Sequence, residues 1–429
     1  MRSHAVVIRM FALGMCAVLA GCTSSSGGGG GGAKKTLVVG AFNPFTGADA
    51  DFGPEMLAGC WPAAKTINDA GGILGNTVTC TSVDTRGDPA DAVPAASKLL
   101  ATTSNLIGIL GPSSDEADST APIFNQAKIP MFADTGEASF DHSSYSYFWR
   151  LTPADDVKGY AMAIWAHDQG WLQGAPVFGN DISSQSNVPT LVKAITAVGG
   201  SVAVNQKITL DQSSYRTEVT QLVQANPQVI YTEADPQSDA AYLGELKELH
   251  GMIPVIGTDA TLQPNWLKAV SGAIGEADMK KYYVGEQPYA PPSGPSWSAF
   301  NTALEASSAQ VPDPQQWNTD VYSMTDYDGV IIMGLAATAA NSTNPSVFNA
   351  YITKVTEPGT GKTLVHTYKE GIAALKAGKQ IQYVGAGGTI VFDKWHNSTG
   401  GFEFARYTGN GHVALLGSVT AAQIEPLLQ

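Results

Sequence analysis

The amino-acid sequence predicts an α/β protein with parallel sheets, and three observations carry that prediction. The chain has 429 residues, which is too long for one ordinary hydrophobic core and indicates two lobes or domains. Hydrophobic residues make up 44% of it and charged residues 14%, a composition typical of globular rather than disordered proteins. Apolar runs of strand length alternate with helical patterns, and this alternation is typical of parallel sheets covered by helices on both faces.

The first set of alternating elements begins at Thr36. Pro54 stands near the start of a helix, and Gly71-Gly72 follows its end, as is typical of helix start and stop signals. Gly111-Pro112-Ser113-Ser114 opens a third helix after a third strand. We expect strands at 36–41, 77–83, 106–110 and 129–133, and helices at 54–69, from the loop 84–89 to about 102, and after 111–114.

A second set of similar size follows Arg150. We expect helices at 155–170, 188–198, 215–224 and 239–250, each followed by a strand, at 175–179, 201–208, 228–232 and 253–257. After Tyr282 the chain becomes strand-like and then proline-rich. Helical patterns follow near 297–308, 321–340 and 346–355, and the end of the chain, 390–419, is rich in β-strand patterns.

The N-terminus carries an export signal. Arg2 and Arg9 precede a short apolar run that ends in Leu19-Ala20-Gly21-Cys22, which resembles the lipobox of bacterial lipoproteins. The resemblance implies that the signal peptide is residues 1–21 and that Cys22 receives the lipid. Residues 22–35, rich in serine and glycine, would form a flexible tether. The alternative is an ordinary signal peptide with a chance cysteine.

The charge of the chain excludes some partners. Its 24 basic and 38 acidic residues give a net charge of −14, which argues against binding to nucleic acid and against direct adsorption on anionic lipid. The apolar stretch 330–340 is shorter than the roughly 20 residues of a membrane span and indicates a core helix. The membrane contact that we expect is therefore the N-terminal lipid alone.

Four cysteines are present, and two of them remain in the body of the protein. Cys16 leaves with the signal peptide and Cys22 takes the lipid. Cys60 falls on a predicted helix and Cys80 on the strand that follows it, in a compartment that is oxidising. We expect a disulfide between Cys60 and Cys80; the alternative is two buried free thiols.

Several motifs in order resemble one family. They are Ile67-Asn68-Asp69-Ala70-Gly71-Gly72-Ile73-Leu74-Gly75, residues 84–89, Gly111-Pro112-Ser113-Ser114, Gly257-Thr258-Asp259 and 383–388. This order, which covers Thr36 to about Leu416, resembles the type I periplasmic solute-binding proteins of branched-chain amino-acid ABC transporters, the Leu/Ile/Val-binding group. The resemblance implies two Rossmann-like lobes with parallel sheets, joined by three crossover segments near 151–153, 285–289 and 385–390.

The same resemblance divides the chain between the lobes. Residues 36–152 plus 287–383 would form the N-terminal lobe, and 153–286 plus 384–429 the C-terminal lobe. Ligand would lie in the cleft between them. The rule that open α/β sheets bind ligands beyond the carboxyl ends of their strands predicts the same position independently.

Candidate ligand contacts in the first lobe follow its strands. Ser113 and Ser114 stand at a helix start, where free backbone N–H groups and the positive helix end suit an anion. The resemblance assigns the ligand carboxylate to this place, with Ser114 the better match; the alternative is plain helix capping. Asp134, Thr135 and Gly136 follow the fourth strand, where the family commonly binds both charged ends of its ligand.

Acidic residues near the fourth strand depart from the family pattern. The family commonly has small and hydroxyl residues there, whereas this chain has Asp134 and Glu137. An extra acid in the cleft would favour a more cationic ligand; the alternative is that one or both acids face solvent.

Further contacts are expected from the second lobe. By the resemblance, Asp259 pairs with the ligand ammonium, and the alternative is an ordinary loop aspartate. Phe52 falls where an aromatic ring often covers the ligand, and the alternative is local packing. Ser184 and Glu233 should also line the cleft.

The resemblance implies an extracytoplasmic, monomeric binding protein that passes a small amino-acid-like solute to the permease subunits of an ABC importer, with no cofactor or metal and no catalytic residues. An amide, polyamine or aromatic acid as ligand remains an alternative, as does a ligand-presenting partner of a sensor. An enzyme is disfavoured because the sequence has no His-Glu-x-x-His or Gly-x-Ser-x-Gly motif. Residues 357–363 resemble a phosphate-binding loop but are preceded by Thr356 where that motif needs glycine.

Overall fold

A computed structural model describes residues 34–47, 49–50, 52–290, 292–398 and 400–428. The chain divides into two units, Met1–Lys34 and Lys35–Gln429, and all elements below belong to the second. The predicted signal peptide, the lipidation site Cys22 and most of the predicted tether lie outside the described residues. No helix in the described part is long and apolar enough to cross a membrane.

The first sheet is parallel throughout. Its strands pair in the order β2-β1-β3-β4-β5. The order reverses between β1 and β3, and this is the point at which open α/β sheets bind ligands. The elements are β1 (Thr36–Asn43), α1 (Phe52–Asp69), β2 (Thr77–Asp84), α2 (Pro89–Thr102), β3 (Leu106–Ser113), α3 (Ser114–Ala127), β4 (Met131–Asp134) and β5 (Phe148–Arg150).

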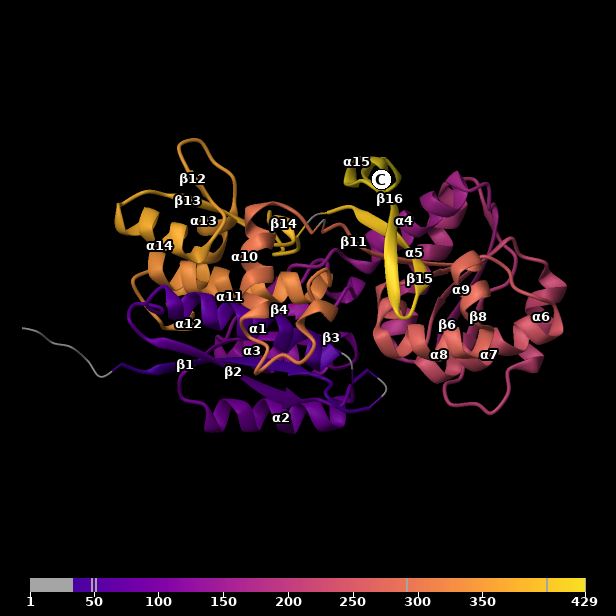
Figure 1. The fold of residues 1–429 in the computed structure, drawn as a ribbon, viewed down its shortest axis with the longest axis horizontal. Helices are drawn as coiled ribbons and strands as arrows, with labels where there is room; N and C mark the ends of the chain where they lie inside the picture. The colour runs from indigo at the N-terminus through magenta and orange to yellow at the C-terminus, as the bar shows by residue number, and fades with distance from the viewer. Residues whose placement is uncertain (1–33, 48, 51, 291, 399, 429) are drawn as a thin grey trace, which may run out of the picture. The chain divides into compact units, whose positions relative to one another are not determined.

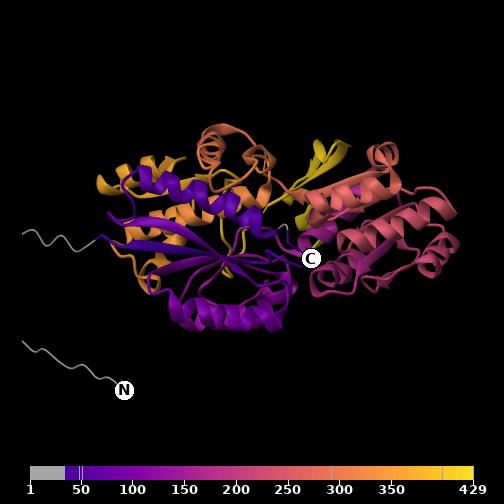
Figure 2. The same cartoon turned by 60° about the horizontal axis from the view of Figure 1, so that its bottom comes forward.

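Alternation along β1 explains why helices cover both faces of this sheet. Leu37, Val39 and Ala41 are buried in a core shared with α1 and α11 (Val321–Ala339), whereas Phe42 is buried with α2 and α3. Successive side chains of a strand point to opposite faces, so an apolar run of this kind needs cover on both sides. Figure 2 shows the sheet between these two helix layers.

The second sheet has the order β16-β15-β11-β10-β9-β6-β7, and β8 also pairs with β6. Its strands are parallel except β15, which runs antiparallel to both of its neighbours, β11 and β16 (Figure 1). The elements are α4 (Asp155–Asp168), β6 (Gln173–Gly179), α5 (Ile182–Ala197), β7 (Ser201–Val202), β8 (Gln206–Ile208), α6 (Arg216–Ala225), β9 (Val229–Glu233), α7 (Pro236–Leu249), β10 (Val255–Gly257), α8 (Pro264–Ile274), α9 (Glu276–Tyr282), β11 (Tyr283–Pro288), β15 (Phe402–Gly409), β16 (His412–Val419) and α15 (Ala421–Ile424).

The segment between β11 and β15 returns to the first sheet. It contains α10 (Gly294–Glu305), α11, α12 (Pro345–Phe348), α13 (Ile352–Thr356), β12 (Thr363–Val365), α14 (Tyr368–Lys376), β13 (Ile381–Gly385) and β14 (Gly388–Thr389). Strand β14 pairs with β13, and Asn397 then bridges to Arg150 at the end of β5. After β11, the chain therefore returns to the second sheet only at Phe402, where β15 begins.

The predicted α/β class with parallel sheets is confirmed, with several corrections to individual elements. The helix predicted at 188–198 begins at Ile182, because Asp181 Oδ1 accepts a hydrogen bond from Ser184 N at 2.7 Å and caps it. Strand β3 runs on to Ser113, past its predicted end at 110. The strand predicted at 201–208 is two short strands, and the helix predicted at 346–355 is broken into α12 and α13. Elements α8, α9, α14, β5, β12 and β13 were not predicted from the sequence.

The predicted disulfide between Cys60 and Cys80 is present. It joins α1 to β2, with the two Cα atoms 6.1 Å apart, and both cysteines belong to the core under α11. The bond closes the segment that carries the Gly71-Gly72 turn, so helix and strand are held together at their buried faces.

Candidate functional site

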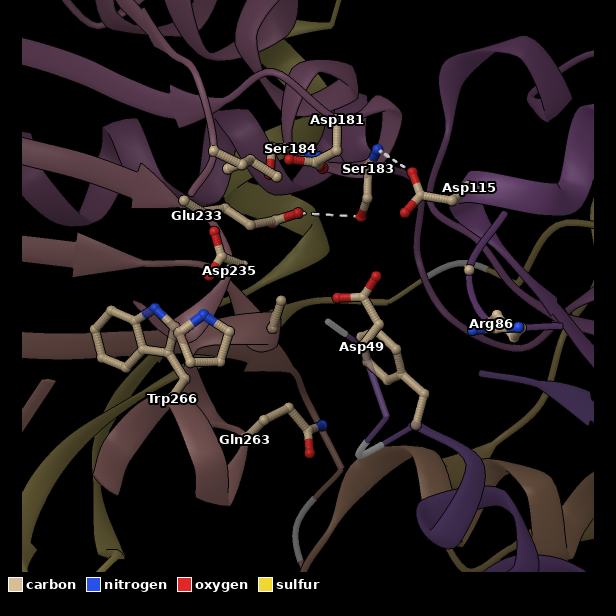
Figure 3. Close-up of a pocket in the computed structure, with 16 residues that line it drawn as sticks. Asp49, Arg86, Asp115, Asp181, Ser183, Ser184, Glu233, Asp235, Gln263 and Trp266 are labelled. Carbon is tan, nitrogen blue, oxygen red and sulfur yellow. Dashed lines mark hydrogen bonds between the residues drawn. The ribbon is translucent and has the colours of Figure 1, made fainter. Parts of the chain in front are cut away.

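Two adjoining pockets lie beyond the carboxyl ends of strands from both sheets, and Figure 3 shows the residues that line the larger of the two. The large pocket has a volume of ≈ 200 Å³ and the small pocket ≈ 40 Å³. Six residues line both: Asp49, Phe52, Asp115, Ser183, Glu233 and Ala260. The large pocket also includes Arg86, Asp181, Ser184, Asp235, Gln263 and Trp266. The small pocket also includes Ser113, Ser114, Asp134, Gly136, Asp155, Lys158, Asp259 and Tyr322.

One wall of the small pocket is the start of α3. Ser113 donates its hydroxyl to Glu116 Oε2 at 2.9 Å instead of capping the helix. The Ser114 and Thr135 hydroxyls are hydrogen-bonded to each other at 3.0 Å. The first turn of this 14-residue helix also carries Asp115 and Glu116, whose carboxyl groups oppose the positive potential of its first N–H groups. This wall therefore presents both hydroxyl groups and an acid to the pocket.

Asp134 and Glu137 differ in position. Asp134 lines the small pocket, and its Oδ2 is buried with no hydrogen-bond partner among the described residues. Burial, followed by the negative charges of Asp320 and Glu116, raises the pKa of Asp134 well above its ordinary value. Glu137 is buried instead against Ser139, whose hydroxyl donates to its Oε2 at 3.2 Å. Of these two acids, Asp134 is therefore the one placed to meet a ligand.

Lys158 brings a buried positive charge to the opposite wall. It lies on the first turn of α4, and its Nζ is 2.6 Å from Asp259 Oδ1 and 3.1 Å from Asp155 Oδ1. Tyr322 donates its hydroxyl to the other oxygen of Asp259. Burial alone would lower the pKa of Lys158, but Asp155 and Asp259 raise it well above its ordinary value. Lys158 is therefore charged, and Asp259 is already paired inside the protein.

Two neighbours fix this ion-pair cluster. Asp155 N donates to Gly136 O at 2.6 Å, and a Cβ at Gly136 would lie 2.0 Å from Asp155 Oδ1, so the close approach requires glycine. Glu286, on β11, is fully buried, and both of its carboxyl oxygens are without a hydrogen-bond partner in the described part. Burial raises the pKa of Glu286 well above its ordinary value, although Lys158 opposes the shift. Burial therefore favours the neutral form of the Glu286 carboxyl group.

Glu233, the last residue of β9, connects the two pockets. Its carboxyl oxygens accept hydrogen bonds from Ser183 Oγ and Asn187 Nδ2, each at 3.1 Å, and from Thr258 Oγ1 at 2.5 Å. Burial raises the pKa of Glu233 to about 8, with Lys158 opposing. Its three donors hold it rigidly at the boundary between the pockets.

The large pocket is surrounded by acids. Figure 3 shows the carboxyl groups of Asp49, Asp115 and Glu233 directed toward the same space, with Arg86 to one side. Burial, then the charges of Asp115 and Asp181, raises the pKa of Asp49 to about 8. Burial and Asp181 raise the pKa of Asp115 to about 6. Like charges that crowd a desolvated space in this way favour a cationic occupant.

Side-chain hydrogen bonds among the described residues join the two sheet layers across the pockets. Ser183 N donates to Asp115 Oδ1 at 3.1 Å, and Gln263 Nε2 donates to Glu55 Oε1 at 3.0 Å. Another is the bond from Tyr322, on α11, to Asp259, which follows β10. In the described residues, no group of three or more His, Cys, Asp or Glu side chains is arranged to hold a metal ion.

Comparison with known proteins identifies the family. The profile of the periplasmic binding proteins matches residues 36–411. The chain belongs to the periplasmic binding protein family. This confirms the resemblance to the type I, branched-chain amino-acid group, whose members are extracytoplasmic solute-binding proteins.

Curated relatives match only parts of this binding protein. An amino acid binding protein of Pseudomonas aeruginosa is 39% identical over 64 residues, 15% of this chain and 17% of that protein. A Leu/Ile/Val-binding protein of Rhizobium johnstonii is 22% identical over 226 residues, 52% of this chain and 61% of that protein. The chain thus matches less than two thirds of the length of either relative.

Solved structures share the fold over almost their whole length. A leucine-binding protein from Thermotoga maritima has a TM-score of 0.70 at 17% identity, covering 89% of this chain and 98% of that one. A solute-binding protein of R. palustris in complex with 4-hydroxybenzoate has a TM-score of 0.69 at 16% identity, covering 90% and 97%. At these identities the likeness concerns the fold alone.

The structure of the binding protein brings most of the predicted ligand contacts together. Eight of them line the pockets: Phe52, Ser113, Ser114, Asp134, Gly136, Ser184, Glu233 and Asp259. The ninth, Thr135, is fully buried and bonded to Ser114, so it positions that hydroxyl from behind. Asp259 differs most from its predicted role, because Lys158 and Tyr322 already occupy its oxygens.

Several pocket residues were missed from sequence. Gln263 and Trp266 belong to the start of α8, and this helix does have a signal, since Trp266, Leu267, Val270 and Ile274 follow Pro264 at helical spacing and are buried. Asp181 stands before α5 as an ordinary N-cap. Lys158 and Asp259 are 101 positions apart, and no local pattern marks their contact.

Proposed function

We propose that this binding protein captures a small amino-acid-like solute in the two pockets and delivers it to the permease subunits of an ABC importer. The observation that carries the proposal is that donors and acids line the same pockets. The Ser114 hydroxyl and the Lys158 ammonium can donate to a carboxylate, whereas Asp49, Asp115 and Glu233, which line both pockets, can accept from an amine.

The strand ends support a cleft that closes on its ligand. Ligand contacts come from loops after β3 and β4 on one sheet and after β9 and β10 on the other, so a bound solute would be held by both. Hinge closure around a ligand is a common response of proteins built in this way. We infer that the protein acts as a monomer, each cleft being complete within one chain.

Attachment to the membrane is the second part of the proposal. The sequence Leu19-Ala20-Gly21-Cys22 and the following serines and glycines support lipidation at Cys22. A short flexible tether would let the cleft reach a permease in the same membrane.

A thermal-shift screen tests the proposed ligand. Neutral, cationic and ω-amino acids, amides, polyamines and aromatic acids are each added to the purified protein. A ligand at about 100 times its Kd stabilises the native state by about 2.7 kcal/mol, which raises the melting temperature. Ser114→Ala should weaken the shift from a carboxylate ligand. Ser119→Ala, on the same helix with its hydroxyl donating to Glu116 O, is the matched control.

A polyamine is the second candidate, and the acidic wall of the large pocket favours it. Asp181 and Asp235 also line this pocket, and each has a buried Oδ2 with no hydrogen-bond partner in the part of the chain that the structure describes. A polyamine needs no carboxylate site, so its binding should be insensitive to Ser114→Ala. Shifts from polyamines alone would move this candidate ahead of amino-acid-like solutes.

A further inference from the structure

A separate cavity, here called the junction pocket, lies where the chain passes from the first sheet to the second. Its volume is ≈ 220 Å³, and the described residues that line it all differ from those of the large and small pockets. Arg150, at the end of β5, and Asn397 come from the side of the first sheet. Asp156 and Val157, on α4, and Ile424, on α15, come from elements that pack on the second sheet. The pocket therefore has walls from both sheet layers.

Part of the junction pocket is apolar. Ile424 is 1% exposed and Ala154 is 7% exposed, and Pro153 and Val157 also line the pocket. A hydrocarbon group placed against these side chains would be removed from water, which is the usual source of affinity in small-molecule sites. The pocket is thus suited to a ligand with an apolar body.

Acids outnumber bases in the rest of the junction pocket. Four described acidic residues line it, against two residues that can carry a positive charge, so the pocket is net negative even with both of these charged. A cationic ligand is therefore favoured over an anionic one. The acids are Asp141, Asp156, Asp393 and Glu425, and the two basic residues are Arg150 and His142.

Arg150 balances one of these acids within the protein. Its side chain is fully buried, with Nη2 2.5 Å from Asp141 Oδ1 and Nη1 donating to Glu137 O at 3.1 Å. Burial raises the pKa of Asp141 to about 6, with Arg150 opposing this shift and the negative charge of Asp156 adding to it. Among the described residues, no basic side chain forms an ion pair with Asp156, and its place in the first turn of α4 favours the charged form. The charge of Asp156 is therefore available to a ligand.

Asn397 adds a hydrogen-bond acceptor to the same pocket. The residue is 7% exposed, and its Nδ2 donates to Asp141 O at 2.7 Å, which fixes the orientation of the amide. Its Oδ1 is buried, with no hydrogen-bond partner in the part of the chain that the structure describes. A buried acceptor left in this state is unfavourable until a donor reaches it. A ligand with N–H groups would supply that donor.

We propose that the junction pocket is a second ligand site of this binding protein, for a small protonated organic amine with an apolar body. The apolar body lies against Ile424 and Val157, and the ammonium group lies near Asp156 and Asn397. The inference goes beyond the proposed function, because it concerns a cavity outside the large and small pockets and requires no particular solute there.

Three related compounds test the chemistry of the site by isothermal titration calorimetry. They are 2-phenylethylamine, 2-phenylethanol and phenylacetate, which share a phenyl group and end in a cation, a neutral hydroxyl and an anion. We expect the amine to bind at least ~10-fold more tightly than the alcohol, since a hydrogen bond to a charged group is stronger than one to a neutral group. Phenylacetate should bind more weakly than the alcohol. Equal binding of amine and alcohol, tighter binding of phenylacetate, or no detectable binding of the amine at millimolar concentration overturns the inference.

Variants in the junction pocket test the location. Asp156→Asn should weaken binding of the amine by at least ~10-fold and leave binding of the alcohol nearly unchanged. Ala421→Leu, at the start of α15, places extra atoms in the pocket and should weaken both compounds. Asp168→Asn, at the exposed end of α4, is the control and should change neither. If Asp156→Asn does not fold, Ala421→Leu decides.

The acidic large pocket is the competing site for an amine, and Asp115→Asn identifies binding there. Asp115 lines the large and small pockets and is absent from the lining of the junction pocket, among the described residues. Amine binding that falls in Asp115→Asn but persists in the folded junction-pocket variants overturns the inference and leaves the proposed function standing. Amine binding that falls in the junction-pocket variants and persists in Asp115→Asn supports the second site, whatever solute the thermal-shift screen identifies.

Discussion

Lys158 and Asp259 form a buried ion pair, 2.6 Å long, between the first turn of α4 and the turn that follows β10. The pair occupies the wall of the cleft where the sequence predicted a free carboxylate for the ligand. Mutation of Asp259 should therefore change the stability of the unliganded protein and not ligand binding alone.

Asp259→Ala should lower the free energy of unfolding by about 3 kcal/mol, because it removes the nearer of the two carboxylates that pair with the buried Lys158 ammonium and leaves that charge with Asp155. Urea denaturation of the ligand-free protein measures this. Asp168→Ala, which removes a largely exposed aspartate at the end of α4, is the control and should change stability by about 0.5 kcal/mol or less. Equal stability of the two variants would show that the ion pair contributes nothing in solution.

The ligand-free protein should become less stable as pH rises from 5 to 8. Burial raises the pKa values of Asp49 and Glu233 to about 8, whereas the pKa of such groups in the unfolded chain is about 4. Between these values the native state holds protons that the unfolded state has lost, so increasing pH lowers the free energy of unfolding. Urea denaturation at several pH values measures the slope.

Glu233→Gln tests the origin of that slope. The amide cannot ionise, so the loss of stability with pH should be smaller than in the wild type. Glu305→Gln, at an exposed position on α10, should leave the slope unchanged. Stability that stays constant or rises between pH 5 and 8 in the wild type would contradict the raised pKa values.

Loss of the disulfide should lower the free energy of unfolding. The bond between Cys60 and Cys80 closes a loop with a sequence separation of 20, for which the chain-entropy model gives about 3 kcal/mol. Cys60→Ala/Cys80→Ala should lower the free energy of unfolding by about that amount, measured without reductant. Reductant should have little further effect on the double variant. A non-reduced digest of the wild type that yields two alkylated thiols would contradict the bond itself.

Cys22→Ser should abolish membrane attachment or leave the precursor uncleaved. The thiol is the predicted site of the lipid, and serine cannot replace it. Cell fractionation and intact-protein mass measure the outcome, and Cys16→Ser, inside the predicted signal peptide, is the control. A Cys22→Ser protein that still carries fatty acid would contradict anchoring at this residue.

Much of the fold was predictable because its signals are local. The apolar strands, Pro54 at a helix start and the Gly71-Gly72 turn each report on a few neighbouring residues. The start of α5 was placed six residues late, since Ser183 and Ser184 look like loop residues until Asp181 is seen to cap the helix. Short elements such as β12 contain too few residues for a periodic pattern of apolar and polar side chains to be recognised in the sequence.

The candidate site was predictable in position but less so in chemistry. Strand ends located Ser114, Asp134, Glu233 and Asp259, because a residue that follows a parallel strand lies at the binding edge of the sheet. Contacts between residues that are far apart in the sequence could not be predicted in this way. Whether Asp259 is free depends on Lys158, and sequence spacing alone gave no reason to connect them.

The position of α11 in the chain has a consequence for the order of folding. Part of one face of the first sheet, at β3 and β4, is covered by a helix made of residues 321–339, where Met333 lies against Gly108 and Gly329 against Phe132, and the edge of β5 meets Asn397. A chain emerging from the ribosome or a translocation channel therefore synthesises its first sheet long before the residues that bury it. Until then the apolar face is exposed to wrong partners. Chaperones that hold the nascent chain should matter more here than for a protein whose first domain is continuous in sequence.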